Sequence, residues 1–155
     1  MFSVLSFAFI SVHLCSSVVS FSGMPLVYLS LGSNLGDRAA NLERAISALP
    51  EAGVRVLRRS SLYETEPVDF LAQPWFLNCV VEAETSLTPR QLLHVLQGIE
   101  RSLGSTKLVA RGPRIIDIDI LFYGASVIRT EEMEIPPCAP ASPALQTLWL
   151  APRWC

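Results

Sequence analysis

The feature that most constrains the fold is the order in which short apolar runs and amphipathic helical patterns follow one another. Residues 26–31, 54–63, 76–84 and 114–123 have the length and side-chain alternation of strands. Residues 38–49 and 88–103 carry helical periodicity, and Thr88, Pro89 and Gln91 form the capping signature of a helix start. The resulting β-α-β-β-α-β order predicts an α+β, ferredoxin-like sandwich with an antiparallel sheet and both helices on one face.

Charge and hydropathy narrow the class of protein. The chain of 155 residues carries 12 Lys and Arg against 14 Asp and Glu, and 50% of its residues are hydrophobic, which is enough for one packed core. This balance offers no basic surface for a nucleic acid and no polybasic patch for a membrane, so we expect neither partner. The mean hydropathy of +0.39 is high, because residues 1–23 contain no Asp, Glu, Lys or Arg.

The two ends of the chain differ from its middle, so we expect three segments. Residues 1–23 form an apolar leader that is a mis-assigned start before Met24, a targeting segment or a structural segment. Residues 24–136 form the folded domain. Residues 137–155 are a Pro- and Ala-rich, nearly uncharged tail of the kind that a shifted reading frame produces. The four cysteines have neither zinc-site nor redox-motif spacing, which favours a reducing compartment and a cytoplasmic location.

Two aspartates in the last strand are the first candidate site. Alternation along 115–121 directs Ile116, Ile118 and Ile120 to the core. Asp117 and Asp119 then share the opposite face, with their side chains about 7 Å apart. Two carboxylates on a rigid strand suit a hard cation such as Mg²⁺, which also binds phosphate. The same pattern is also that of the polar face of a half-buried strand, which is common in antiparallel sheets.

Other features flank that pair. Arg114 stands three residues before Asp117, where it either contacts a phosphate or forms a salt bridge with a carboxylate. The turn over 32–37 either offers backbone amides to an anion or only links a strand to a helix. Phe76 and Asn78 share a face of the third strand, which suits a flat heterocycle, although a core Phe and a turn-adjacent Asn fit the same pattern. The glycine- and lysine-containing motif of a P-loop is absent from the sequence.

Four stretches together carry a family resemblance. They read LSLGSNLGD from Leu29, SSLYETEP from Ser60, QPWFLN from Gln73 and GPRIIDID from Gly112. The Gly-Pro-Arg-x-x-Asp-x-Asp pattern is the most specific of them, and Gly-Ser-Asn-Leu-Gly is also distinctive. In these stretches, and in their order over residues 26–136, the chain resembles the 6-hydroxymethyl-7,8-dihydropterin pyrophosphokinase family of folate biosynthesis.

The resemblance implies a reaction and a set of site residues. The family transfers pyrophosphate from ATP to 6-hydroxymethyl-7,8-dihydropterin and releases AMP, using two Mg²⁺ ions held by the residues that match Asp117 and Asp119. Arg114 would act with them as a catalytic residue that contacts phosphate. The residues matched to the pterin site are Thr65, Glu66, Val68, Phe76 and Asn78. Those matched to the nucleotide site are Leu93, Gln97, Glu100, Lys107, Arg111, Arg114 and Ile120.

The chain also departs from the family pattern. Ser105 and Lys107 occupy positions where the mobile loop of the family carries arginines, Arg111 replaces an expected tryptophan, and an expected His and Arg are missing after Pro136. These departures leave two interpretations. The chain is either an active Mg²⁺- and ATP-dependent pyrophosphokinase, expected to be a cytoplasmic monomer, or a degenerate ferredoxin-like module that binds pterin or nucleotide with little or no turnover.

Overall fold

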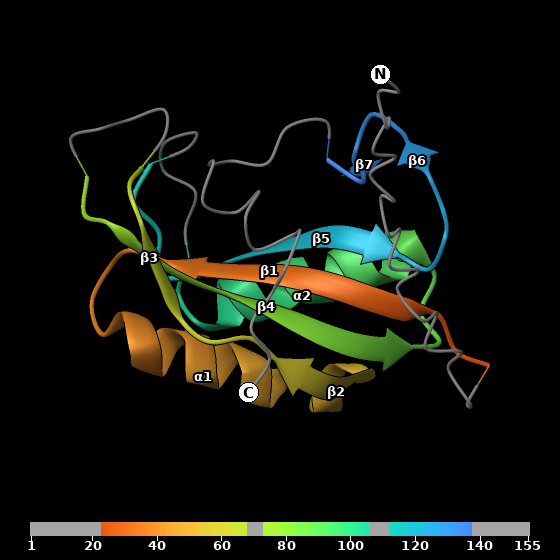
Figure 1. Ribbon diagram of the computed structural model, residues 1–155, viewed down its shortest axis with the longest axis horizontal. Coiled ribbons are helices and arrows are strands. Elements are labelled where there is room, and N and C mark those ends of the chain that lie inside the picture. The colour runs from red at the N-terminus through yellow and green to blue at the C-terminus, as the bar shows by residue number, and fades with distance from the viewer. Residues whose placement is uncertain (1–22, 68–72, 106–111, 138–155) are drawn as a thin grey trace, which may run out of the picture.

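The computed structural model describes residues 23–67, 73–105 and 112–137. Within these ranges the main sheet has the strand order β2-β4-β1-β5, and every neighbouring pair is antiparallel (Figure 1). Its strands are β1 (Leu26–Ser33), β2 (Val54–Arg59), β4 (Phe76–Thr85) and β5 (Asp117–Tyr123), and the short β3 (Tyr63–Thr65) also pairs with β4. Counted along the chain, the four long strands lie in the order 2-3-1-4, which confirms the ferredoxin-like arrangement.

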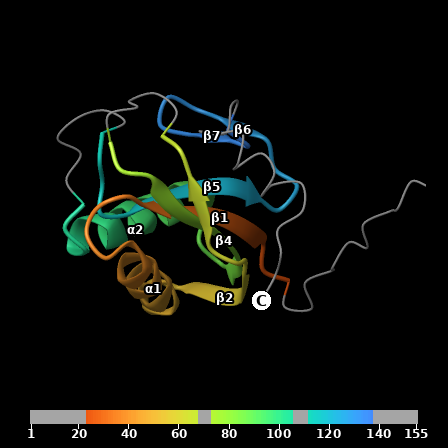
Figure 2. The same ribbon diagram turned by 60° about the vertical axis from the view of Figure 1, so that its left-hand side comes forward.

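Both helices cover the same face of this sheet, as predicted (Figures 1 and 2). They are α1 (Arg38–Ala48) and α2 (Pro89–Ser102). Asp37 accepts a hydrogen bond from the Ala40 amide at the start of α1, and Thr88 and Gln91 form the predicted capping box of α2. Smaller elements complete the described chain: a 3₁₀ turn (Pro50–Ala52) and the hairpin β6 (Ile128–Arg129) and β7 (Glu134–Ile135).

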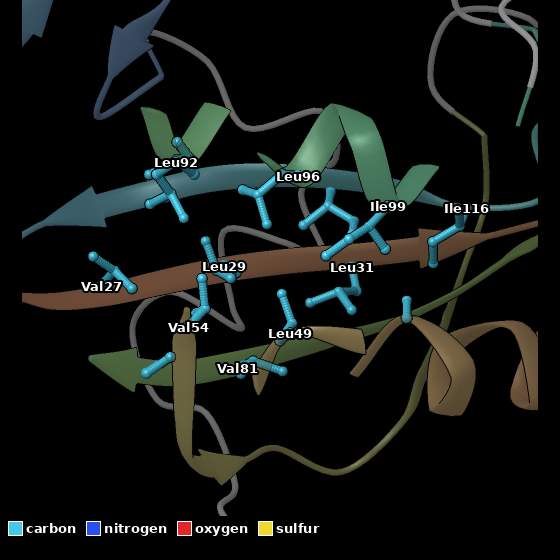
Figure 3. Close-up of a cluster of buried hydrophobic side chains, with 14 of the residues drawn as sticks. Val27, Leu29, Leu31, Leu49, Val54, Val81, Leu92, Leu96, Ile99 and Ile116 are labelled. Atoms are coloured by element: carbon cyan, nitrogen blue, oxygen red, sulfur yellow. The ribbon is translucent and has the colours of Figure 1, made fainter. Parts of the chain in front are cut away.

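The core lies between the helices and the sheet. Figure 3 shows how it is assembled: α2 contributes one row of side chains, β1 a second row, and β4 and the segment around β2 a third. The labelled residues of this cluster are Val27, Leu29, Leu31, Leu49, Val54, Val81, Leu92, Leu96, Ile99 and Ile116. Because these side chains occupy the helix-covered face, the alternate residues of each strand project from the opposite face, called here the open face.

The prediction for the second strand is wrong in its side-chain pattern. Unbroken alternation over 54–63 places Val56 and Arg58 on one face. In the structure a bulge separates them, so that Val56 lies opposite Ala83 while Arg58 lies opposite Glu82. Ala83 and Glu82 are consecutive and point to opposite faces, so the bulge turns Arg58 to the open face. There it makes a two-bond contact with the buried Glu82 carboxylate, which also accepts from the Tyr28 hydroxyl.

The same predicted strand is also interrupted before it reaches Tyr63. Ser60 leaves the regular ladder, and its Oγ accepts a hydrogen bond from the Val80 amide at 2.9 Å. A side-chain oxygen thus takes the place of a backbone acceptor, which keeps β4 satisfied while the chain changes direction. Pairing resumes in β3, where Tyr63 lies opposite Asn78 and Thr65 opposite Phe76. The interruption therefore brings the residues after Ser60 alongside the start of β4, where Phe76 and Asn78 lie.

The first strand is longer than predicted. The sequence indicates a turn that begins at Gly32, because glycine is depleted in strands. In the structure β1 continues through Gly32 and Ser33, and the turn begins at Asn34. Gly32 is held extended by neighbours on both sides, Asn78 on β4 and Asp117 on β5.

The termini largely fall outside the described residues, which include only Gly23 of the predicted leader and Pro137 of the predicted tail. Among the helices that the structure describes, none has the length and apolar character needed to cross a bilayer.

Candidate active site

The two aspartates lie at the start of β5, on the open face. Asp117 is opposite Gly32 and Asp119 is opposite Ser30 of β1. Ile118 between them is buried, whereas Asp117 is half-buried and Asp119 is exposed. Ile116 and Ile120 are buried in the core as well, so the predicted division of this strand into an apolar and a carboxylate face is confirmed.

Arg114 forms the salt bridge that was one of its two predicted roles. Its Nη1 lies 2.6 Å from Oδ2 of Asp117, and the two side chains are 18% and 21% exposed. The Nε of Arg114 also donates to the Gly112 carbonyl at 3.3 Å. The guanidinium is thereby held beside the Asp117 carboxylate, where it would lower the repulsion that a polyphosphate meets. Direct contact between Arg114 and a phosphate stays a prediction.

The carboxylate pair fits a metal that brings most of its own ligands. Among the residues that the structure describes, no three His, Cys, Asp or Glu side chains gather into a closed metal cage. Mg²⁺ does not require one, because it keeps several waters and is commonly bound by one or two carboxylates together with substrate phosphates. Asp117 and Asp119 therefore suit a magnesium ion that is shared with a nucleotide.

A buried asparagine that the sequence did not single out connects three parts of the site. Asn34 is 2% exposed, and its Oδ1 accepts from the Arg114 amide at 2.8 Å. Its Nδ2 donates to Gln73 Oε1 at 3.0 Å and to the Pro74 carbonyl at 3.2 Å. The turn after β1, the segment before β4 and the entrance of β5 are thus joined by one side chain. The Gly-Ser-Asn-Leu-Gly motif was the available signal, but its interpretation as an anion-binding turn or a plain connection missed this role.

The residues predicted to bind the pterin meet at the start of β4. Phe76 and Asn78 are two residues apart on that strand and both lie on the open face, and Thr65 of β3 lies beside them. Asn78 Nδ2 donates to Thr65 Oγ1 at 2.9 Å, and both side chains are buried. Glu66 is exposed next to this group, and Val68 lies outside the described residues. The structure therefore brings together an aromatic ring and an oriented amide, a pair that suits a flat heterocycle with a polar edge.

The residues predicted to line the nucleotide site are arranged differently. Leu93, Gln97 and Glu100 follow one side of α2, which packs against β5. Glu100 Oε1 accepts from the Ile118 amide at 2.8 Å and so anchors the strand that carries the aspartates. Ile120 is buried in the core rather than on the carboxylate face. This group therefore adjoins β5 from the helix side, and its contact with a nucleotide stays a prediction.

The loop between α2 and β5 is described only at its two ends. Ser105, at a position where the resemblance leads us to expect an arginine, is buried and donates from Oγ to the Ile116 carbonyl at 2.7 Å. It is a structural residue that closes the helix onto β5. Lys107 and Arg111 lie outside the described residues.

Cys79, the one cysteine within the described residues, has a thiol of low reactivity. Cys79 is adjacent to Asn78 but points into the core, where burial raises the pKa of its thiol to about 12. Since the thiolate is the reactive form, Cys79 takes no nucleophilic part in this site.

These features define a class of protein: a ferredoxin-like domain whose open sheet face holds a carboxylate pair with an arginine next to an aromatic ring with an oriented amide. Residues 28–144 match the family model described as 7,8-dihydro-6-hydroxymethylpterin-pyrophosphokinase, abbreviated HPPK. The chain belongs to this family.

Curated relatives agree with that assignment. The chain is 46% identical over 112 residues to 2-amino-4-hydroxy-6-hydroxymethyldihydropteridine pyrophosphokinase of Bacillus subtilis, covering 72% of the chain and 67% of the relative. It is 49% identical over 110 residues to folic acid synthesis protein fol1 of Pneumocystis carinii, covering 71% of the chain and 15% of the relative. For the mitochondrial folate synthesis bifunctional protein of Pisum sativum the identity is 44%, covering 71% of the chain and 21% of the relative. The chain thus spans only a small part of the last two proteins.

Solved structures agree on the fold. HPPK-DHPS of Plasmodium falciparum, wild type with pterin and p-hydroxybenzoate, superposes with a TM-score of 0.51 at 20% identity, covering 68% of this chain and 28% of that one. A structure of HPPK-DHPS in complex with substrates gives a TM-score of 0.51 at 16% identity, over the same shares of the two chains.

Proposed function

We propose that this chain transfers the pyrophosphoryl group of ATP to 6-hydroxymethyl-7,8-dihydropterin in folate biosynthesis. The observation that carries the proposal is a row across the open face, in which Asn78, Gly32 and Asp117 stand side by side on β4, β1 and β5. Neighbouring strands lie about 4.8 Å apart, so the backbones that carry the Asn78 amide and the Asp117 carboxylate are about 10 Å from each other. That span suits a bicyclic heterocycle whose one-carbon alcohol faces a phosphate.

The reaction balances without any further reactant. The hydroxymethyl oxygen attacks the β-phosphorus of ATP, and the bond from that phosphorus to the oxygen that bridges to the α-phosphate breaks. AMP leaves with the bridging oxygen, and the alcohol proton passes to solvent. Because a phosphoryl-type transfer requires little covalent help, the protein contributes mainly by positioning and electrostatics.

On the pterin side, Asn78 orients the polar edge of the ring and Phe76 stacks on its face. The hydrogen bond from Asn78 to Thr65 fixes the direction of the amide before the ligand arrives, which reduces the ordering cost of binding. Glu66 and Val68 continue this side of the site.

On the phosphate side, Asp117 and Asp119 hold Mg²⁺, proposed as two ions. When bound, the metal offsets negative charge on the phosphate oxygens. Arg114 exchanges part of its salt bridge with Asp117 for a phosphate contact. Leu93, Gln97, Glu100 and Ile120, with Lys107 and Arg111 of the loop, form the nucleotide side. We propose further that residues 24–136 act as one monomeric, cytoplasmic domain.

One observation favours a second candidate, a module that binds the same ligands with little turnover. Ser105 is buried and bonded to Ile116, so at this position the chain supplies no cation to the phosphates. Loss of a positive group that stabilises the transition state typically costs rate by orders of magnitude while it spares ground-state binding.

The experiment is an assay of AMP formation from ATP and 6-hydroxymethyl-7,8-dihydropterin by the full chain. Asp119→Ala should lower the rate by at least about 100-fold, as expected when metal-mediated charge stabilisation is lost. Glu131→Ala, at an exposed carboxylate in the turn before β7, should leave the rate unchanged. EDTA should abolish AMP formation and added Mg²⁺ should restore it.

The outcomes separate the two candidates. AMP and pterin diphosphate formed in equal amounts support the enzyme. Absence of AMP above the Asp119→Ala background rejects it, and pterin binding under the same conditions then supports the binding module.

A further inference from the structure

A glycine without a role in the proposed chemistry lies at the centre of the site. Gly32 is buried within β1, with Asn78 on one side and Asp117 on the other. Residues directly opposite one another in a sheet project to the same face, so a side chain at position 32 would rise from the open face between the two halves of the site.

The space above Gly32 is occupied by the amide of Asn78. A Cβ built at Gly32 would lie 2.6 Å from Asn78 Oδ1 and 3.6 Å from Phe76 Cδ1. A carbon and an oxygen normally stay about 3.3 Å apart or more. The amide therefore rests on the bare Cα of Gly32, a position that no residue with a side chain would allow.

The other end of the same amide is fixed as well. Asn78 is 4% exposed, and its Nδ2 donates to Thr65 Oγ1 at 2.9 Å. The amide is thus held between Thr65 at its nitrogen and Gly32 beneath its oxygen. A methyl group at Gly32 would push the oxygen away and either lengthen the bond to Thr65 or turn the amide plane. Only the end of a side chain has to move, so the strand pairing of Gly32 would survive the change.

We propose that Gly32 is a positioning residue that sets pterin affinity by leaving room for the Asn78 amide oxygen above β1. The inference deepens the proposed function and rests on it, because Asn78 is the group proposed to recognise the polar edge of the pterin. It accounts for a glycine within β1, since glycine is unfavourable inside a strand unless another group approaches the backbone closely.

The test measures ligand binding without turnover, using the full chain and 6-hydroxymethylpterin as the probe. Gly32→Ala should raise the Kd for the pterin by about 10- to 100-fold, the range expected when hydrogen bonds to a buried amide are misaligned. The Kd for a non-hydrolysable ATP analogue should change by less than about twofold, and circular dichroism should show that the variant is folded. Gly98→Ala on α2 is the matched control, since the nearest atom to its added Cβ is 4.0 Å away.

A double-mutant cycle shows whether Gly32 acts through Asn78. In an Asn78→Ala background the crowded oxygen is gone, so Gly32→Ala should change the pterin Kd by less than about twofold. Unchanged pterin binding by Gly32→Ala overturns the proposal, and so does an equal effect of Gly32→Ala in both backgrounds. A fall in kcat with unchanged pterin affinity also overturns it.

The same measurements keep this inference distinct from the proposed function. If the unmodified chain binds the pterin but forms no AMP, the catalytic proposal fails while the Gly32 proposal is still decided by the binding data. If the unmodified chain binds no pterin, both proposals fail.

Discussion

Replacing Asn34 with alanine tests whether one buried side chain holds the candidate site together. The side chain is 2% exposed and takes part in three hydrogen bonds, one to Arg114, one to Gln73 and one to the Pro74 carbonyl. Each such bond contributes about 1 kcal/mol net, and buried partners left unpaired cost more. We therefore expect Asn34→Ala to lower the free energy of unfolding by about 3 kcal/mol.

Urea unfolding followed by circular dichroism measures this loss. With an m-value of about 2 kcal/mol/M, the midpoint should fall by about 1.5 M. Gln73→Ala is an internal control, because it removes only one of the three bonds and should cost about 1 kcal/mol. In the AMP assay Asn34→Ala should raise KM for both substrates, since the segments that it joins carry residues proposed for both sides of the site.

The reasoning is refuted if Asn34→Ala costs less than about 1 kcal/mol, or no more than Gln73→Ala. It is also refuted if the effects of the two substitutions add fully in the double variant. The two residues share a bond, so removing the second partner should cost less once the first is gone.

Two further predictions concern the core. Leu96→Ala on α2, at a fully buried position, should cost about 2–5 kcal/mol in the same urea assay, while Val127→Ala, at a position 76% exposed, should cost less than about 0.5 kcal/mol; equal losses would contradict the core assignment. Burial raises the pKa of Cys79 from 9.0 to about 12, so the folded state favours the neutral thiol, and this contribution to stability is fully present below pH 9 and is lost as pH rises toward 12. The free energy of unfolding, measured by urea titration between pH 8 and pH 10, should fall more steeply for the unmodified chain than for Cys79→Ala, by up to about 1.4 kcal/mol per pH unit, and parallel profiles would contradict the assignment.

Local patterns were enough to predict most of the architecture. The capping box of Thr88 and Gln91 and the Asp37 cap depend on residues within one helical turn, so the sequence contains all the partners. The placement of Asp117 and Asp119 on one face follows from the two-residue period of a strand and needs no knowledge of its neighbours.

The features that the sequence analysis predicted wrongly all depend on partners that are distant in sequence. The register of β2 against β4 shifts by one residue at the bulge between Val56 and Arg58. This shift depends on the pairing with β4, so the alternation of side chains within 54–63 does not reveal it. The break at Ser60 is likewise explained only by the Val80 amide, 20 residues away.

The sequence by itself determined the order of elements, the faces of the last strand and the family to which the motifs point, because these depend on short-range periodicity and spacing. Only the tertiary structure decided that Gly32 is a paired strand residue on which the Asn78 amide rests, and that Asn34 joins three segments of the site. The physical reason is that strand pairing on both sides of Gly32 overrides the low strand preference of glycine, and that the hydrogen-bond partners of Asn34 lie in segments distant in sequence.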